Sequence, residues 1–303
     1  EVIKVDVSSV SGGNGATDNA TQQSITLTDD DVASLVVSVD NLTVSETGTT
    51  STFTVKLSSE PTSSVSVTLD RNSSDEFSVS DNLSFDASNW NSLQTVTVTG
   101  VDDAVADDNQ TSTLTLSSSS SDSYYNGLSD NLSVTTTDND TAGISISCCS
   151  TDSVDGSSRE NAVSLSETGG STTFTVVLDT EPSTTVTLVI DPRQPGEFST
   201  TMDNLTFTTG NWNTPQIVTI NAVSDDEDDG DIEGTVRVTP DNSSSIDPNY
   251  AGLSFTAVWF KNVDDDTAGF NISKGTALVA ETGTTDNFSV VLTSAPTGDV
   301  TVS

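Results

Sequence analysis

The sequence predicts an all-β chain built from tandem antiparallel β-sandwiches of about seven strands each. Apolar and polar residues alternate in short runs such as Thr52–Leu57 and Val65–Leu69, which is the period of a half-buried strand. These runs carry the β-branched residues that suit a pleated sheet, and no stretch has helical period. The whole pattern recurs after about 110 to 125 residues, near the size of one small domain.

Seven strand-like runs, A to G in chain order, make up the first complete repeat. They are Leu35–Val44, Thr52–Leu57, Val65–Leu69, Glu76–Val79, Thr95–Val101, Thr113–Leu116 and Leu132–Thr136. Seven strands in about 110 residues are typical of an immunoglobulin-like sandwich.

Sequence landmarks recur in the same order in the second repeat. Ser45-Glu46-Thr47-Gly48 returns as Ser166–Gly169 and again as Ala280–Gly283, Asn89–Asn91 returns as Asn211–Asn213, and Tyr125–Leu128 returns as Tyr250–Leu253. The expected domain boundaries are therefore 1–31 for the last strands of a preceding repeat, 32–140 and 141–266 for two complete repeats, and 267–303 for the first strands of a following one.

The second repeat has an insertion near residues 147–162 that the other repeats lack. It contains adjacent cysteines, Cys148 and Cys149, which could form a strained vicinal disulfide, pair with another chain or stay free. Two cysteines in 303 residues exclude a disulfide-stapled scaffold, so hydrophobic cores and other ligands must hold the fold.

The composition is strongly acidic, with a formal net charge of -38, eight Lys plus Arg and no His. Nucleic acid is excluded as a partner because phosphate binding needs clustered Lys and Arg, and an anionic membrane surface is disfavoured for the same reason. No apolar stretch approaches the ~20 residues of a membrane span, and no signal peptide opens the chain. We therefore expect a processed product or part of a longer protein.

The carboxylates occupy particular places. In a sandwich whose strands alternate in direction, the A–B, C–D and E–F connections and the end of strand G share one pole, and acidic residues occur at all four places in both repeats. In the first repeat these are Glu46, Asp70, Asp102, Asp103, Asp107, Asp108, Asp138 and Asp140; in the second they are Glu167, Asp191, Asp225, Asp226, Glu227, Asp228, Asp229, Asp264, Asp265 and Asp266. Asp29, Asp30, Asp31 and Glu281 stand at corresponding places in the partial repeats.

So many converging carboxylates would resist ionising together without a compensating cation. Ca²⁺ accepts about six to eight oxygens in flexible geometry, whereas Mg²⁺ prefers stricter geometry and zinc prefers N or S ligands. Calcium is the predicted cofactor. The alternatives are that Asp simply populates turns, or that the charge makes a solvated, salt-adapted surface.

The repeats resemble Calx-beta domains, a family that includes calcium-sensing modules of sodium/calcium exchangers and tandem repeats of large bacterial surface proteins. The resemblance rests on the glutamates in Val44-Ser45-Glu46 and Leu165-Ser166-Glu167, the acidic E–F loops after Val101 and Val223, and the acidic triplet after strand G. It implies calcium held at those positions. Asn139 interrupts the first triplet and Ala104-Val105-Ala106 interrupts the first E–F loop, so fewer or weaker ions are expected in the first repeat.

Two of the three tryptophans, Trp90 and Trp212, invite a carbohydrate-platform hypothesis. Trp90 and Trp212 precede strand E at the same place in each repeat, which favours a role as core or rim plugs. Trp259 is out of phase with Val258 and Phe260, so it should point away from the core, toward a ligand, another chain or a covering loop.

No catalytic constellation emerges from the residue types, because the chain lacks His, a nucleophile–base pair and a glycine-rich phosphate loop. The sequence therefore predicts a non-enzymatic extracellular or cell-surface array, the calcium-loaded rigid stalk of an adhesin, surface protein or filament. Its expected partners are neighbouring repeats and a cell-surface or glycan ligand. Two alternatives are a self-assembling filament whose partial repeats are completed by identical subunits, and a calcium sensor.

Overall fold

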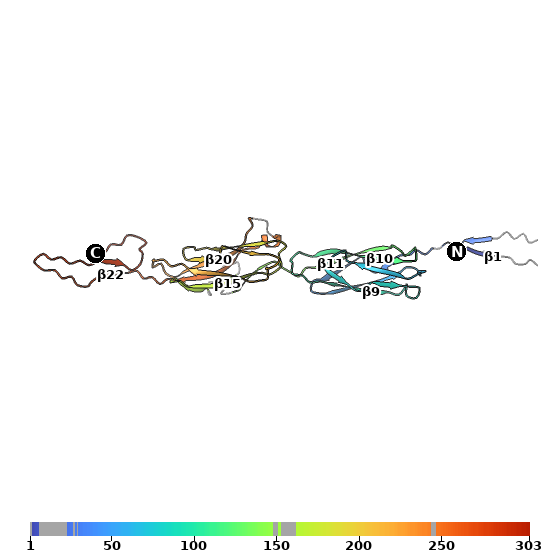
Figure 1. Cartoon of the computed structure of the whole chain (residues 1–303), viewed down its shortest axis with the longest axis horizontal. Coiled ribbons are helices and arrows are strands. Elements are labelled where there is room, and N and C mark those ends of the chain that lie inside the picture. Colours follow the sequence, from blue (N-terminus) through green and yellow to red (C-terminus); the bar gives the residue numbers. More distant parts are fainter. Residues whose placement is uncertain are drawn as a thin grey trace, which may run out of the picture. The chain divides into compact units, whose positions relative to one another are not determined.

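The structure, a computed structural model, describes residues 2–5, 23–26, 28, 30–147, 151–152, 162–243 and 247–303. Figure 1 traces the strands in chain order. The Cα positions divide the chain into two compact units. Unit 1 comprises Glu1–Asp102 and Asn109–Asp138, and unit 2 comprises Asp103–Asp108 and Asn139–Ser303. Cys148, Cys149 and Asp29, singled out in the sequence, lie outside the described residues.

The sandwich of unit 1 is made of two sheets, as the alternating runs predict. Its strands are β3 (Leu35–Val37), β4 (Asn41–Ser45), β5 (Thr50–Leu57), β6 (Val65–Asp70), β7 (Phe77–Val79), β8 (Leu83–Phe85), β9 (Gln94–Gly100), β10 (Gln110–Ser120) and β11 (Ser129–Thr137). One sheet has the order β4-β11-β10-β6-β8, and the other has the order β3-β5-β9-β7.

The structure describes nine strands in this sandwich where seven were expected. Predicted strand A is divided into β3 and β4, which lie in different sheets. Predicted strand D corresponds to β7, which pairs with β9, and the next strand, β8, which pairs with β6, was not predicted. β4 runs parallel to β11, whereas the other pairs in this sandwich are antiparallel. Strands that switch sheets in this way close the corners of a sandwich.

Unit 2 repeats this plan. Its sandwich is formed by β12 (Ile144–Ser147), β13 (Thr151–Asp152), β14 (Val163–Ser166), β15 (Ser171–Leu178), β16 (Val186–Pro192), β17 (Phe198–Thr200), β18 (Asn204–Phe207), β19 (Gln216–Ala222), β20 (Ile232–Pro240) and β21 (Thr256–Val263). The sheet orders are β12-β15-β19-β17 and β13-β21-β20-β16-β18, with β14 parallel to β21.

Short strand pairs lie outside the sandwiches. β1 (Val2–Val5) pairs with β2 (Gln23–Thr26), and β22 (Phe270–Ile272) pairs with β23 (Val290–Leu292). One helical turn, α1 (Pro248–Ala251), precedes β21 and was not predicted. Its sequence signal is Asp247 followed by Pro248, since the aspartate caps the turn and proline is tolerated at its first position. Within the described residues, no helix has the length and apolarity to cross a bilayer.

Each sandwich has its own core, and the strand periodicity explains which residues enter it. In β5 the alternating residues Phe53, Val55 and Leu57 are buried, and Phe174, Val176 and Leu178 repeat this pattern in β15. Trp90 and Trp212 pack at the margin of their cores, which confirms the plug interpretation. Their carbonyl oxygens also accept hydrogen bonds from the N–H groups of Leu57 (2.8 Å) and Leu178 (3.1 Å).

Trp259 stands between the buried Val258 and Phe260 in β21. Its side chain therefore lies on the outer face of the sheet, as its phase predicts, and it is half-buried there.

Candidate metal centres

Three carboxylates of unit 2 converge at one end of the sandwich. Glu167 follows β14, Asp225 lies in the E–F loop between β19 and β20, and Asp266 lies just after β21. Each can offer one oxygen such that all three oxygens lie within 4.8 Å of one another. Two oxygens on opposite sides of one calcium ion are about 4.8 Å apart, at about 2.4 Å each from the metal. The three groups can therefore share an ion.

Local backbone structure explains why Glu167 reaches this position. The N–H of Glu167 donates to Val263 O (3.1 Å), which joins the residue to the end of β21, where the acidic triplet begins. Gly169, two residues later, has φ +109 and allows the tight turn into β15. The same landmark glycine has φ +80 at Gly48 and +91 at Gly283. The recurring Glu-Thr-Gly turn thus places Glu46 and Glu167 next to the other carboxylates at one end of the sandwich.

The Glu167 side chain is only 4% exposed, and its Oε1 accepts a hydrogen bond from Asp225 N (2.7 Å). That bond lowers the pKa of the Glu167 carboxyl, but burial and the negative charges of Asp225, Asp264 and Asp265 outweigh it and leave the pKa above its ordinary value. Burial, followed by the charges of Asp265, Asp226, Asp264 and Asp225, also raises the pKa of Asp266. Such raised pKa values are the electrostatic cost of gathering carboxylates that a cation would relieve.

Backbone N–H groups hold the rest of the acidic loop in place. Asp264 accepts from Gly230 N (2.7 Å) and Asp266 N (2.8 Å), while Asp228 accepts from Ala268 N (2.7 Å). Asp231 forms an ion pair with Lys261 (2.5 Å), and this bond lowers the pKa of Asp231. Several predicted ligands thus organise the loop rather than join the three-carboxylate group.

The first repeat, expected at residues 32–140, has a corresponding group. Glu46, which is 1% exposed, and Asp138 offer oxygens within 4.8 Å of each other and of Asp140, two residues further along the chain. No residue of the first E–F loop belongs to this group among the described residues. Asp102, Asp103, Asp107 and Asp108 therefore lie outside it.

Asp70 and Asp191, the ligands expected at the C–D connections, belong to neither three-carboxylate group. Asp70 lies opposite Thr115, five residues into β10, and Asp191 lies opposite Arg237, five residues into β20. At about 3.4 Å per residue, both aspartates are roughly 17 Å from the start of the F strand. Asp191 instead forms an ion pair with Arg193 (2.8 Å), and Asp70 accepts from Asn72 N (2.9 Å).

The C–D connection continues to the pole before strand D begins, so a different acidic residue lies there. Glu76 O accepts from Val101 N (2.9 Å), and Glu197 O accepts from Val223 N (2.8 Å), where each E–F loop starts. The Glu197 carboxylate accepts from Asn262 Nδ2 (3.0 Å). Sequence reasoning missed both glutamates, although the shared Glu-Phe at the start of strand D was a usable signal.

The remaining predicted positions do not form such a group in the described residues. Asp30, Asp31 and Glu281 are exposed, and neither three-carboxylate group includes Asp226, Asp228, Asp229, Asp264 or Asp265. Asp265 still acts on the site through its charge, because it helps to raise the pKa of Glu167.

The donor set decides which metals fit. All candidate ligands are oxygens, and the chain has no histidine to supply a nitrogen ligand, so zinc is a poor match. Three carboxylates suit calcium, whose flexible coordination can be completed by carbonyl oxygens and water.

No protein-family model matches the chain, and no curated protein matches it. Solved structures similar to it include CBD12 from CALX1.2, with 15% identity, 70% of this chain and 83% of that chain covered and a TM-score of 0.28. Calcium binding domain CBD12 of CALX1.1 is 12% identical over 70% of this chain and 82% of its own, with a TM-score of 0.29. Extracellular cadherin domains 1–4 of protocadherin gamma B7 are 13% identical, with 87% of this chain and 60% of that chain covered and a TM-score of 0.32.

Similarities of this size carry no argument about the chain, and its fold class rests on its own strands and sheets. The chain is an all-β protein of immunoglobulin-like sandwiches.

Proposed function

We propose that the chain is a calcium-binding structural module array of the Calx-beta type, in which each sandwich holds calcium at its acidic pole. The observation that carries the proposal is the three-carboxylate group of Glu167, Asp225 and Asp266, whose oxygens lie close enough to ligate one ion. Its recurrence with Glu46, Asp138 and Asp140 supports the same role in the first repeat.

The ion would add a link between three segments that are far apart in the sequence: the turn after β14, the E–F loop and the segment after β21. It would also relieve the repulsion that raises the pKa of Glu167. Extracellular calcium modules bind with Kd around 10⁻⁴ to 10⁻³ M. An ion at about a hundred times its Kd adds roughly 2.7 kcal/mol to folding stability per site.

We further propose that the array serves as a stiff, non-enzymatic stalk of an extracellular or cell-surface protein. A chain with net charge -38 needs abundant cations, and extracellular fluid supplies calcium at the concentration that weak sites require. Neighbouring repeats would be its main partners, with a cell-surface or glycan ligand for the assembly as a whole.

Isothermal titration calorimetry with Ca²⁺, after chelation of the purified 303-residue chain, tests the proposal. We expect saturable binding that Glu167→Gln weakens at least tenfold at one class of site, because one of three shared carboxylates is lost. Asp203→Asn is the matched control, since Asp203 is an exposed acidic residue of the same unit outside the group. Equal calcium binding by both variants would remove the assignment, and Mg²⁺ binding as tightly as Ca²⁺ would contradict the choice of metal.

A further inference from the structure

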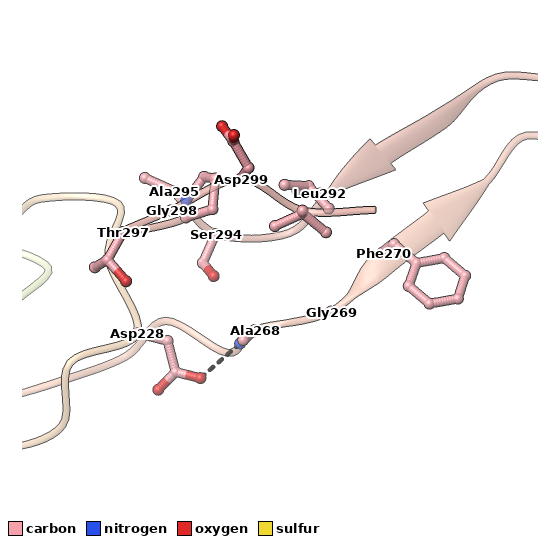
Figure 2. Close-up of a pocket in the computed structure, with 12 residues that line it drawn as sticks. Asp228, Ala268, Gly269, Phe270, Leu292, Ser294, Ala295, Thr297, Gly298 and Asp299 are labelled. Atoms are coloured by element: carbon pink, nitrogen blue, oxygen red, sulfur yellow. Dashed lines mark hydrogen bonds between the residues drawn. The ribbon is translucent and has the colours of Figure 1, made fainter. Parts of the chain in front are cut away.

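A pocket of about 530 Å³ lies between the E–F loop of unit 2 and the segment that carries β22 and β23. Figure 2 shows Asp228 on one side, joined to Ala268 by a hydrogen bond, and the turn that contains Ser294 and Thr297 on the other. Phe270, Leu292 and Val300 also line the pocket. It therefore combines an apolar floor with hydroxyl groups.

The pocket belongs to a structural element that occurs three times in the chain. Leu35 pairs with Leu57, Ile144 with Leu178, and Phe270 with Leu292, each time in antiparallel register. An equivalent backbone hydrogen bond lies next to each pair. Ser58 N donates to Ser34 O (3.1 Å), Asp179 N donates to Gly143 O (3.0 Å), and Thr293 N donates to Gly269 O (2.9 Å). Ser294 thus corresponds to Ser59 and Thr180, and Thr297 corresponds to Thr62 and Ser183.

In both sandwiches a buried tyrosine, 1% exposed, occupies this place. The Tyr125 hydroxyl donates to Ser59 O (2.7 Å) and accepts from Ser59 N (3.0 Å). The Tyr250 hydroxyl donates to Thr180 O (2.8 Å) and accepts from Thr180 N (3.2 Å). One residue of the turn after strand B therefore bonds the phenol through both its carbonyl and its N–H.

An aspartate three residues before each tyrosine binds the same turn. Asp122 accepts from Thr62 N (2.8 Å), and Asp247 accepts from Ser183 N (2.5 Å) and Ser183 Oγ (2.7 Å). The Asp-x-x-Tyr sequence between strands F and G is thus a two-point anchor onto the turn after strand B. These hydrogen bonds at the phenol and the carboxylate, three in the first sandwich and four in the second, give this contact both affinity and register.

The third copy of this turn exposes the surface that the other two bury. Val65 and Val186 are fully buried, whereas the corresponding Val300 is 54% exposed. Leu57 and Leu178 are buried, whereas Leu292 is half-buried. Exposed apolar surface of this kind marks an interaction site.

We propose that this pocket binds a β-hairpin of a further repeat of the same type, anchored by the tyrosine and aspartate of an Asp-x-x-Tyr turn. The tyrosine ring would lie on Leu292 and Val300 with its hydroxyl at Ser294, and the aspartate would accept from Thr297 N. The hairpin's second strand would lie along residues 277–280, as β21 lies along β14 and β11 along β4. This docking does not depend on calcium, so its failure and that of the metal proposal are distinguishable.

The test is binding of a fluorescently labelled peptide to the whole chain. The peptide has the sequence of Gln110–Thr137, which contains strands F and G of the first repeat and the Asp-x-x-Tyr turn between them. The buffer contains about 150 mM salt, which screens long-range charge repulsion between the peptide and the acidic chain. We expect saturable binding by fluorescence anisotropy, with hydrogen-exchange protection gained in residues 268–303. Tyr125→Phe in the peptide should weaken binding about fivefold and Asp122→Ala about tenfold, because they remove neutral and charge-assisted hydrogen bonds respectively.

Leu292→Lys in the protein should abolish binding, whereas Val291→Lys should not, because Val291 is 61% exposed, alternates with Leu292 along β23 and does not line the pocket. The proposal is overturned if the peptide does not bind, if neither peptide substitution weakens binding, or if protection appears only outside residues 268–303. Because the peptide substitutions leave the protein unchanged, their outcome is independent of any folding defect in the Leu292 variant.

Discussion

The two acidic groups differ in one ligand source. In the second repeat the group combines Glu167 and Asp266 with Asp225 of the E–F loop, whereas in the first repeat Glu46 combines with Asp138 and Asp140, and among the described residues no residue of the E–F loop joins them. A group drawn from three separate segments cross-links more of the sandwich than one drawn from two. The second repeat should therefore depend more on its ion.

The longest run of differences between the two E–F loops is three residues. Ala104-Val105-Ala106 stands where the second repeat has Asp226-Glu227-Asp228. In the second loop, Asp228 binds Ala268 N and Asp225 binds Glu227 N, so the acidic residues also fold the loop. The alanines and valine cannot supply side-chain oxygens for either purpose.

Removal of calcium should have the largest effect. We expect EDTA to lower the melting temperature by more than about ten degrees, since a site occupied at about a hundred times Kd contributes roughly 2.7 kcal/mol and a domain of this size shifts by about 4–8 °C per kcal/mol. Hydrogen exchange should show greater loss of protection in unit 2 than in unit 1. An unchanged melt, or equal loss in the two units, would break the comparison.

Substitution of the two buried glutamates should change the unfolding free energies of the two units by different amounts. With saturating calcium, Glu167→Gln should destabilise unit 2 by about 2–3 kcal/mol, because the bound ion's contribution is lost, and Glu46→Gln should cost unit 1 less. In EDTA the sign should reverse for Glu167→Gln, because burial and neighbouring carboxylates oppose the ionised glutamate. Urea unfolding with and without calcium measures both effects; the same sign in both conditions would contradict the account.

Transplanting the loop should sharpen the comparison. The combined substitution Ala104→Asp, Val105→Glu and Ala106→Asp should raise the calcium affinity of the first repeat about tenfold, because affinity rises with the number of ligand charges. Calorimetry on the graft, with an Asn-Gln-Asn graft as the uncharged control, measures this. If both grafts behave alike, loop charge is not what separates the repeats.

A smaller effect is expected at the end of the loop. Gly230 has φ +78, and the corresponding Asp108 has φ 63. Aspartate tolerates this left-handed conformation better than most residues, but a Cβ still costs about 1 kcal/mol. Gly230→Ala should therefore destabilise unit 2 by about 1 kcal/mol in urea unfolding. A clash would not explain this loss, since nothing lies within 4 Å of the added Cβ. A neutral result would show that the loop relaxes.

The smallest effect should come from pH. The folded-state pKa values of Glu167 and Asp266 are raised, so their contribution to stability is present at low pH and is lost as pH rises through those values. In EDTA, unit 2 should thus gain stability as pH falls from neutral toward the raised pKa values of these two carboxyls. With calcium the trend should reverse, because protons compete with the ion. Thermal melts at each pH, with Glu167→Gln as control, measure the difference.

Much of the fold could be predicted from local patterns. The alternation of Phe53, Val55 and Leu57 predicts their burial, because the side chains of a strand point to opposite faces in turn. The recurrence of Glu46 as Glu167 predicts a carboxylate at the turn after strand A, and the structure places both with other carboxylates. Alternating strand direction was enough to expect a shared acidic pole.

Register, turn geometry and strand division could not be predicted in this way. Whether Asp70 or Glu76 lies at the pole depends on how far strand C runs along strand F, which is set by cross-strand pairing and not by spacing along the chain. The parallel contacts of β4 and β14 also depend on strand A leaving one sheet for the other.

By itself, the sequence determined the repeat, the strand period and the kind of ligand atom available, because these follow from residue chemistry and order. The tertiary structure alone decided which carboxylates share a site and which turn receives Tyr125 and Tyr250. These choices join residues far apart in the chain, such as Glu167 with Asp225 and Thr180 with Tyr250. Distances between such residues are fixed only when the two sheets pack.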